Sequence, residues 1–314
     1  MTRIALIIVA SLLAITSFSV QPAVAAEQQS ILVTGASTGI GRNLAETLAR
    51  NGYHVYAGAR KAADINALTA IENITAVRLD VTKQDEVDAV VAQIEASGTG
   101  LYGLVNNAGI GDGGPIVETP IAEQTLVYQI NVEGVYRTTQ AFAPLVMESK
   151  GRIATTGSIA GTLAWAGGSA YSGSKHWIEA FTDSLAAEMA PHGVSVSVIE
   201  PGNFQSFIRR SAAKRKMARV QAAGGEITPE MEAGFEQTVE RELSFKQPDE
   251  VSAAFMHALF DDTPLRRYVV APNADEQQRT IATKIQQLVE LNSWGPHAYD
   301  RDELVKMLDA ALLK

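Results

Sequence analysis

The chain has 314 residues, a formal net charge of −9 and no cysteine. The absence of cysteine excludes disulfides, thiolate metal sites and a cysteine nucleophile. A chain this acidic lacks the basic surface that phosphate binding requires, so we expect no nucleic-acid partner. Its five histidines show no metal-ligand spacing, so we also expect no metal site. With 46% hydrophobic residues, the composition is typical of a globular protein with a substantial core.

Residues 1–26 have the pattern of a secretory signal peptide. Arg3 precedes a nearly continuous apolar run of 17 residues, Ile4 to Val20, and small residues follow as in an Ala-x-Ala cleavage site. We predict cleavage after Ala25 or Ala26 and export to the periplasm. The alternative is an uncleaved N-terminal anchor that associates the protein with a membrane, because 17 apolar residues lie at the lower limit for spanning a bilayer.

From residue 27 onward, short apolar runs alternate with amphipathic stretches. We predict seven strands, at residues 31–33, 54–57, 76–79, 101–105, 152–156, 194–199 and 268–270. Helices are expected between them, including Asn43–Asn51 and Gln84–Ser97. This alternation predicts an α/β fold with a doubly wound parallel sheet of the Rossmann type, covered by helices on both faces. Residues 27–314 are therefore expected to form one domain.

Two regions depart from this rhythm. Residues 204–245 are polar, carry six basic side chains between Arg209 and Arg219, and are interrupted by Gly224-Gly225. Their position after the sixth predicted strand favours a mobile lid over a substrate cleft, with a solvated helical face as the plainer alternative. The C-terminal tail has two apolar helical faces that predict packing or oligomer surfaces: Ile281, Ile285 and Leu288, and then Leu304, Leu308 and Leu312.

A glycine-rich turn directly follows the first predicted strand and opens a helix. Glycines permit a tight turn and a close approach of backbone N–H groups to a pyrophosphate, and a helix N-terminus adds partial positive charge. The turn therefore predicts a dinucleotide site, with contacts from Gly35, Ser37, Thr38, Gly39, Ile40 and Gly41.

The end of the second predicted strand should discriminate between dinucleotides. A carboxylate there would bind the ribose hydroxyls, whereas an arginine would accommodate a 2′-phosphate. This chain has Arg60 and Lys61 and no acid, so we predict a preference for NADP(H), with NAD(H) as the alternative. Asp80, at the end of the third predicted strand, is a candidate for the adenine amino group, and Val81 follows it.

Tyr171 and Lys175 stand four residues apart, which places them on one face of a helix. A lysine ammonium held there favours the tyrosinate and should lower the tyrosine pKa from its usual value of about 10. Such a tyrosine exchanges protons near neutral pH, as carbonyl reduction or alcohol oxidation requires.

With these residues and several further motifs, the chain resembles the short-chain dehydrogenase/reductase family over roughly Ser30 to Val270. The motifs occur in order: the glycine-rich turn, Asn106-Asn107-Ala108-Gly109, Asn131, Ser158 thirteen residues before Tyr171, Lys175, and Pro201-Gly202. The resemblance implies that Tyr171 is the general acid/base, that Lys175 lowers its pKa and holds the nicotinamide ribose, that Ser158 binds the substrate oxygen, and that Asn131 anchors a proton-relaying water. It also implies cofactor contacts from Asn107, Ala108, Gly109, Pro201 and Gly202, with Ser206 near the carboxamide.

Within the family, Val198–Gly202 and the segment ending at Val270 look like the retinol and 17β-hydroxysteroid dehydrogenase branch. That resemblance implies an NAD(P)(H)-dependent oxidoreductase that interconverts a lipophilic alcohol and its ketone or aldehyde. A homo-oligomer, dimer or tetramer, is expected on the same ground. Two alternatives remain at this point: a non-catalytic dinucleotide-binding module and a nucleotide-sugar epimerase, although the spacing of Gly35, Gly39 and Gly41 disfavours the latter.

Overall fold

A computed structural model describes residues 28–313, so the predicted leader at 1–26 lies outside the described residues. Seven strands form one sheet in the order β3-β2-β1-β4-β5-β6-β7, and every neighbouring pair is parallel. The strands are β1 Ser30–Val33, β2 His54–Ala59, β3 Ile74–Arg78, β4 Gly103–Asn106, β5 Arg152–Thr156, β6 Ser195–Pro201 and β7 Arg267–Val270. The predicted doubly wound α/β fold is confirmed.

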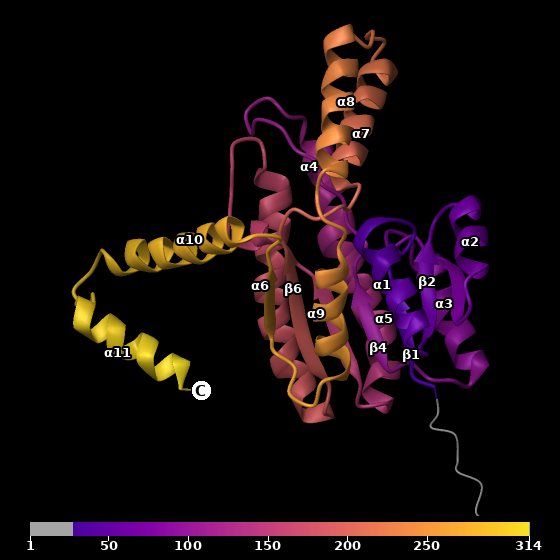
Figure 1. Cartoon of the computed structure of the whole chain (residues 1–314), viewed down its shortest axis with the longest axis horizontal. Coiled ribbons are helices and arrows are strands. Elements are labelled where there is room, and N and C mark those ends of the chain that lie inside the picture. Colours follow the sequence, from indigo (N-terminus) through magenta and orange to yellow (C-terminus); the bar gives the residue numbers. More distant parts are fainter. Residues whose placement is uncertain (1–27, 314) are drawn as a thin grey trace, which may run out of the picture.

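Helices cover both faces of this sheet (Figure 1). Those that pack on it or on its edges are α1 Gly39–Arg50, α2 Ala62–Thr69, α3 Gln84–Ser97, α4 Ile121–Tyr128, α5 Gly134–Glu148, α6 Ser169–Met189 and α9 Asp249–Phe260. Short η turns join some of them: η1 Gln129–Glu133, η2 Ile159–Gly161 and η3 Ala190–His192. Four further helices project from this body: α7 Ile208–Ala222, α8 Pro229–Leu243, α10 Ala274–Asn292 and α11 Arg301–Leu312.

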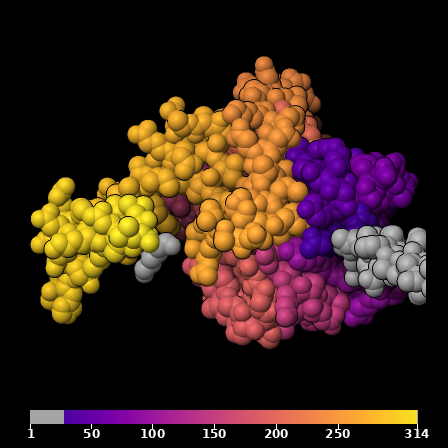
Figure 2. Space-filling model, turned by 60° about the horizontal axis from the view of Figure 1, so that its bottom comes forward, coloured from indigo at the N-terminus to yellow at the C-terminus, as the bar shows by residue number. Residues whose placement is uncertain are grey.

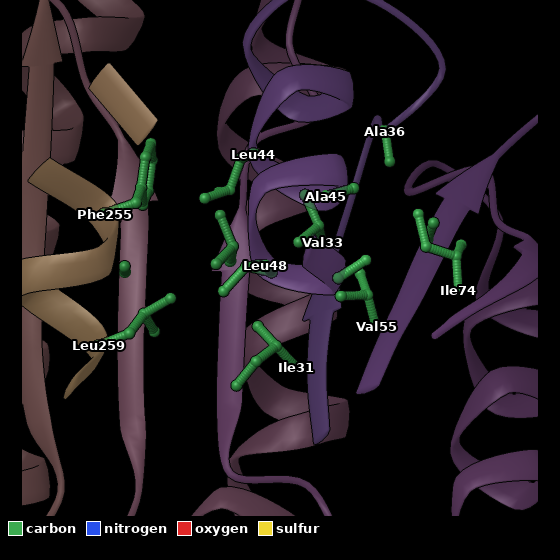
Figure 3. Close-up of a cluster of buried hydrophobic side chains, with 14 of the residues drawn as sticks. Ile31, Val33, Ala36, Leu44, Ala45, Leu48, Val55, Ile74, Phe255 and Leu259 are labelled. Carbon is green, nitrogen blue, oxygen red and sulfur yellow. The ribbon is translucent and has the colours of Figure 1, made fainter. Parts of the chain in front are cut away.

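Alternating side chains of the strands feed two separate cores. Ile31 and Val33 of β1 point into one core, and Leu32 points into the other. The first core lies under α1 and α9, whose Leu48 and Phe255 are fully buried against the sheet (Figure 3). The second lies under α3, α5 and α6. A strand buried on both faces needs apolar residues at every position, which explains the unbroken apolar runs in the sequence.

Some predicted boundaries were wrong by a few residues. The first helix begins at Gly39 rather than at Asn43, because the end of the glycine-rich turn is itself the first helical turn. The sixth strand continues to Pro201, two residues past Ile199, and its Glu200 and Pro201 are buried like the apolar residues before them. Because Glu200 is polar, the apolar run ends at Ile199, and the predicted strand therefore ended before the observed one.

The projecting helices leave the body in two directions (Figure 1). Helices α7 and α8 form a hairpin that rises above the carboxyl edge of the sheet, and α10 and α11 extend sideways from the body (Figures 1 and 2). No residue of α7 or α11 is buried. Among the helices of residues 28–313, none combines the length and apolar character needed to cross a bilayer.

Candidate active site

The glycine-rich turn forms a cradle that only glycine fits. Gly35 and Gly39 have positive φ values of 65° and 59°, a conformation that side chains rarely adopt. A Cβ on Gly41 would lie 2.3 Å from Asn107 Nδ2, and one on Gly39 would lie 2.6 Å from the Ser206 carbonyl oxygen. The backbone is therefore bare at the N-terminus of α1, the arrangement that receives a pyrophosphate. Of the other predicted contacts, Thr38 is exposed, and Ser37 and Ile40 are half-buried.

A hydrogen-bond network holds this turn against the end of β4. Thr34 Oγ1 accepts from the backbone N–H groups of Asn107 and Ala108, at 2.9 and 3.0 Å. Asn107 Nδ2 donates to the carbonyl oxygens of Thr34 and Gly35, at 3.0 and 3.2 Å. The side chain of Asn107 thus braces the cradle from below, and Thr34, which the sequence did not single out, is the reciprocal half of this brace.

The adenosine end of the predicted site lies beyond β2 and β3. The Arg60 guanidinium is 3.7 Å from the Asp80 carboxylate, and Arg78 donates to the Arg60 carbonyl oxygen. Burial raises the pKa of Asp80, but hydrogen bonds from Thr82 and the charges of Arg60 and Lys83 outweigh it and lower that pKa overall. Val81 is buried, and its side chain lies against Gly134 at the start of α5. The structure therefore brings Arg60 and Asp80 together, and Arg60 is mostly exposed.

Asn131 lies in η1, a π-turn between α4 and α5. Its amide donates to the Ile110 carbonyl and to Ser174 Oγ and accepts from the Ile110 N–H, at 2.9, 3.0 and 2.9 Å. A Cβ on Gly109 would lie 3.3 Å from Asn131 Oδ1, so the segment after β4 passes close by. Both amide N–H groups are engaged, and the side chain ties three segments together. π-turns of this kind are frequent at functional sites.

Ser158, Tyr171 and Lys175 converge at the carboxyl ends of β5 and β6. Ser158 caps η2 by accepting from the Ala160 N–H at 3.1 Å, and its hydroxyl also reaches the Pro201 carbonyl at 3.5 Å. Tyr171 and Lys175 follow on the first turns of α6, with Lys175 Nζ 5.8 Å from the centre of the tyrosine ring. One hydroxyl, one phenol and one ammonium therefore share a small volume beside the cradle.

The electrostatic balance at Tyr171 differs from the sequence expectation. Burial raises the pKa of Tyr171 above its usual 10, and the Ser158 hydrogen bond and the Arg209 charge only partly oppose this. Burial likewise lowers the pKa of Lys175 to about 8, although the Glu179 carboxylate counteracts it. Lys175 Nζ also donates to the Thr156 carbonyl at 2.7 Å, which directs the ammonium toward the sheet. The expected lowering of the tyrosine pKa by lysine is thus outweighed by desolvation.

The loop after β6 closes the site from above. Gly202 donates its N–H to the Val270 carbonyl, and Asn203 bonds to the Glu276 carboxylate of α10 through both its backbone N–H and its side chain. Ser206 lies directly against Gly39 of the cradle. Pro201, Gly202 and Ser206, which the sequence assigned to the nicotinamide end, therefore stand between the cradle and Ser158.

Two charged groups near the site escaped the sequence reading. Glu200 is 3% exposed on β6, and burial together with the Glu179 charge raises its pKa to about 7, against the opposing charges of Arg267 and Lys284. Arg209, at the start of α7, influences Tyr171 as described above. Glu200 lies within the segment Val198–Gly202 and Arg209 within the basic run of residues 204–245, but the sequence assigned neither of them a role at the site.

Residues 29–217 match the model of the short chain dehydrogenase family. The chain is 36% identical over 213 residues to the mitochondrial D-beta-hydroxybutyrate dehydrogenase of Bos taurus, covering 65% of this chain and 61% of that protein. It is 38% identical over 184 residues to retinol dehydrogenase 5 of Mus musculus, covering 56% and 57%. The chain thus spans about three fifths of the length of the curated relatives it matches.

Solved structures show the same fold. A short-chain dehydrogenase from Streptomyces avermitilis superposes with a TM-score of 0.69 at 28% identity, covering 85% of this chain and 96% of that one. A short chain dehydrogenase from Burkholderia cenocepacia J2315, solved in complex with NADP, superposes with a TM-score of 0.65 at 22% identity, covering 86% and 99%. The family resemblance drawn from the sequence motifs is confirmed.

Proposed function

This chain belongs to the short chain dehydrogenase family, and from that premise we propose that it is an NAD(P)(H)-dependent oxidoreductase that interconverts an alcohol and a ketone or aldehyde. The observation that carries the proposal is the convergence of Ser158, Tyr171 and Lys175 beside a side-chain-free glycine cradle. Hydride chemistry is what a bound nicotinamide dinucleotide supplies, and the cradle at Gly35, Gly39 and Gly41 fits its pyrophosphate.

The chain's own residues would manage the substrate oxygen and its proton. The Tyr171 hydroxyl, with a raised pKa, is protonated at neutral pH and donates its proton to a carbonyl oxygen during reduction. The Ser158 hydroxyl would hydrogen-bond the same oxygen as negative charge develops there. Lys175, positively charged below about pH 8, would stabilise the resulting tyrosinate. Asn131 would keep the π-turn in place and anchor a proton-relaying water.

NADP(H) is the proposed cofactor and NAD(H) the alternative. In support, no carboxylate ends β2, and an exposed arginine, Arg60, directly follows this strand, as expected of a residue that accommodates a 2′-phosphate. Exposed ion pairs contribute little, so Arg60 could leave Asp80 for a phosphate at small cost. A lipophilic substrate is proposed on the relatives named retinol dehydrogenase and on exposed apolar side chains near the site, such as Trp165 at 6.2 Å from the Tyr171 ring.

The test is a fluorescence titration of the purified full-length protein with NADPH and with NADH, followed by turnover of ketones. Tyr171→Phe should bind the dinucleotide as the wild type does and lose at least about 10³-fold in kcat, because the proton donor is gone. Full turnover by Tyr171→Phe would disprove the assigned mechanism. Binding without any hydride transfer would favour the non-catalytic alternative, and turnover without net cofactor consumption would favour an epimerase.

We propose further that residues 1–26 direct export, with cleavage after Ala25 or Ala26, and that an uncleaved anchor is the alternative. Intact mass of the protein purified from its native cell would distinguish the two, since the leader is present in one case only. A homo-oligomer is proposed on the exposed apolar face of α10, where Ile285 and Leu288 are 56% and 52% exposed. Light scattering would measure its size.

A further inference from the structure

Helix α7, above the carboxyl edge of the sheet, is strongly basic within an acidic protein. Its 15 residues include six lysines and arginines and no acid, although the chain carries a net charge of −9. The six are Arg209, Arg210, Lys214, Arg215, Lys216 and Arg219. A cluster of one sign beside a cleft concentrates ligands of the opposite sign.

Three of these six charges are neutralised by neighbouring carboxylates. Arg215 and Arg219 both bond to the Asp112 carboxylate, at 3.2 and 2.9 Å, and this side chain is only 4% exposed. Arg210 pairs at 2.8 Å with Glu242 of α8, which is 1% exposed. These pairs fix α7 between α8 and the loop after β4, and they account for the structural share of its charge.

Arg209 has a different environment. Within residues 28–313 its guanidinium forms no ion pair, donates to the neutral amide oxygen of Asn203, and lies 5.7 Å from the centre of the Phe245 ring. Lys216, which is exposed and equally without an ion pair in that range, follows seven residues later. Seven residues are about two helical turns, so both cations lie on one face of α7.

Arg209 stands at the end of the loop that leads from the reacting groups to α7. The residue follows the loop that starts at Pro201, whose carbonyl accepts from the Ser158 hydroxyl. Ile208, its neighbour, would touch a Cβ on Gly111 at 3.1 Å, so the start of α7 lies over the segment after β4. The charge of Arg209 is also felt at the Tyr171 hydroxyl, where it lowers the pKa against the effect of burial.

The loops beside the start of α7 expose apolar side chains, here called the apolar rim. The segment between Asp112 and α4 exposes Ile116 and Val117, at 67% and 93%, and Trp165 is 54% exposed on the opposite loop. The two loops meet, since a Cβ on Gly113 would lie 2.3 Å from the Gly167 carbonyl oxygen. The rim therefore offers apolar surface together with an unneutralised guanidinium, the complement of an amphiphilic anion.

We propose that the substrate carries a carboxylate, held by Arg209, on an apolar chain whose ketone or hydroxyl group reacts at Tyr171. The proposal rests on the oxidoreductase function proposed above and deepens it. Guanidinium groups bind carboxylates in a bidentate, charge-assisted manner. In the reducing direction the carbonyl carbon accepts hydride from the reduced dinucleotide and its oxygen accepts the Tyr171 proton, while the carboxylate is unchanged. Lys216 assists by attracting the anion toward Arg209.

The test compares acids with neutral analogues of the same length. Full-length wild type and the variants Arg209→Gln, Lys216→Gln and Lys214→Gln would reduce 4-oxodecanoate, 5-oxodecanoate and their methyl esters. Lys214 is the matched control, because it lies four residues after Arg210, on the face toward α8. Binding of decanoate, which cannot react, would be measured in parallel by calorimetry, and NADPH and NADH binding by fluorescence.

We expect wild type to prefer the acids, and Arg209→Gln to lose roughly 10- to 100-fold in kcat/KM for them, mainly through KM. Its loss with the methyl esters should be several-fold smaller than its loss with the acids, because the esters lack the carboxylate and share only the effect on Tyr171, and decanoate binding should weaken in step with the acids. Lys216→Gln should lose about two- to fivefold for the acids only, and Lys214→Gln should match wild type.

Four results would overturn the proposal. Equal losses for acids and esters would make Arg209 a structural residue. A tenfold weaker NADPH or NADH affinity in Arg209→Gln would place its charge on a cofactor phosphate instead. If wild type reduced the esters as well as the acids, the substrate would need no carboxylate, while the proposed oxidoreductase function would stand. If the protein bound a dinucleotide but reduced no ketone, the proposed function itself would be refuted, and this inference with it.

Discussion

The sheet with its flanking helices and the four projecting helices are held in opposite ways. Helices α1 and α9 bury Leu44, Leu48, Phe255 and Leu259 completely against the strands. Helix α7, in contrast, has no buried residue, and its fixed points are ion pairs such as those of Asp112. Packing of apolar surface fixes the first region, while charge and hydrogen bonds fix the second.

This difference separates two functions within one molecule. The groups proposed to do the chemistry belong to the packed body: Ser158 caps η2 just after β5, and Tyr171 and Lys175 stand on α6. The groups proposed to choose the substrate stand on α7 and its neighbours, which apolar packing does not constrain. Regions of low local stability are the ones that open and close around ligands. The sheet and its flanking helices form a rigid frame that can hold the reacting groups in place, while the projecting helices adapt to the substrate.

Among the changes to the packed body, the largest effect on ligand binding should come from adding a methyl group at the cradle. In Gly41→Ala the new methyl would lie 2.5 Å from the Gly35 carbonyl oxygen as well as against Asn107 Nδ2. We expect the free energy of unfolding to fall by about 2 kcal/mol, as overpacking typically costs. Dinucleotide affinity should drop more than tenfold, because the brace shifts. Calorimetry of unfolding and fluorescence titration measure the two effects, and unchanged values for both would show that the cradle is less rigid than its contacts indicate.

A second prediction concerns a charge inside the frame. The Glu200 carboxyl has a pKa of about 7 in the folded protein, above its ordinary value of 4.5, so it holds its proton more tightly when folded. Stability is therefore lost as the pH rises from about 4.5 to 7, and the loss is complete above the folded pKa. Glu200→Gln, which stays neutral, should raise the free energy of unfolding at pH 8 by up to about 3 kcal/mol and change it little at pH 4.5.

The control for this prediction is Glu118→Gln, which removes an exposed carboxyl. It should change stability equally little at both pH values. If Glu200→Gln destabilised the protein at pH 8, the carboxylate would be bound there as an ion by Arg267 and Lys284, and burial would not be the dominant effect.

The same contrast explains what the sequence could predict. Several strands of the sheet contain a run of apolar residues such as Ile31-Leu32-Val33, so the existence of the strands and their parallel arrangement could be predicted from composition and alternation. The catalytic set followed from fixed spacings within one family, since Ser158, Tyr171 and Lys175 lie close along the chain. Features that depend on residues close together in the chain can be predicted in this way.

The projecting helices could not be predicted in the same detail. Helix α7 has neither an apolar stripe nor a buried residue, so its sequence shows no hydrophobic periodicity that would predict which face packs on the body. Its contacts depend on partners far away in the chain, as Arg215 with Asp112 is separated by 103 residues. For the same reason the sequence assigned no individual role to Arg209 within the predicted lid or to Glu200 within Val198–Gly202, because the groups that act on them lie far away in the chain.

A third, smaller effect should distinguish the ion pairs of α7 from the packing of the sheet and its flanking helices. In Asp112→Asn the ion pairs with Arg215 and Arg219 become weaker neutral contacts. Burial raises the pKa of Asp112, but hydrogen bonds from Arg219 and Arg215 lower it overall, so the group is ionised at neutral pH. We expect hydrogen exchange in α7 to accelerate about tenfold, while the melting temperature of the body changes little. The control is Asp302→Asn, an exposed partner of Arg301; a large drop in melting temperature would contradict the separation.

The smallest effect tests whether the hairpin is stabilised independently of the sheet. Gly234 lies inside α8, and no atom outside its own helix would come within 4 Å of an added Cβ. Alanine at a free helical position is more favourable than glycine by about 1 kcal/mol. Gly234→Ala should therefore slow hydrogen exchange in α8 by about fivefold. Because α7 and α8 open without unfolding the body, the melting temperature should stay within about 1 °C of wild type. A rise of several degrees would mean that the hairpin and the sheet unfold as one unit, and the division between rigid frame and adaptable helices would then be incorrect.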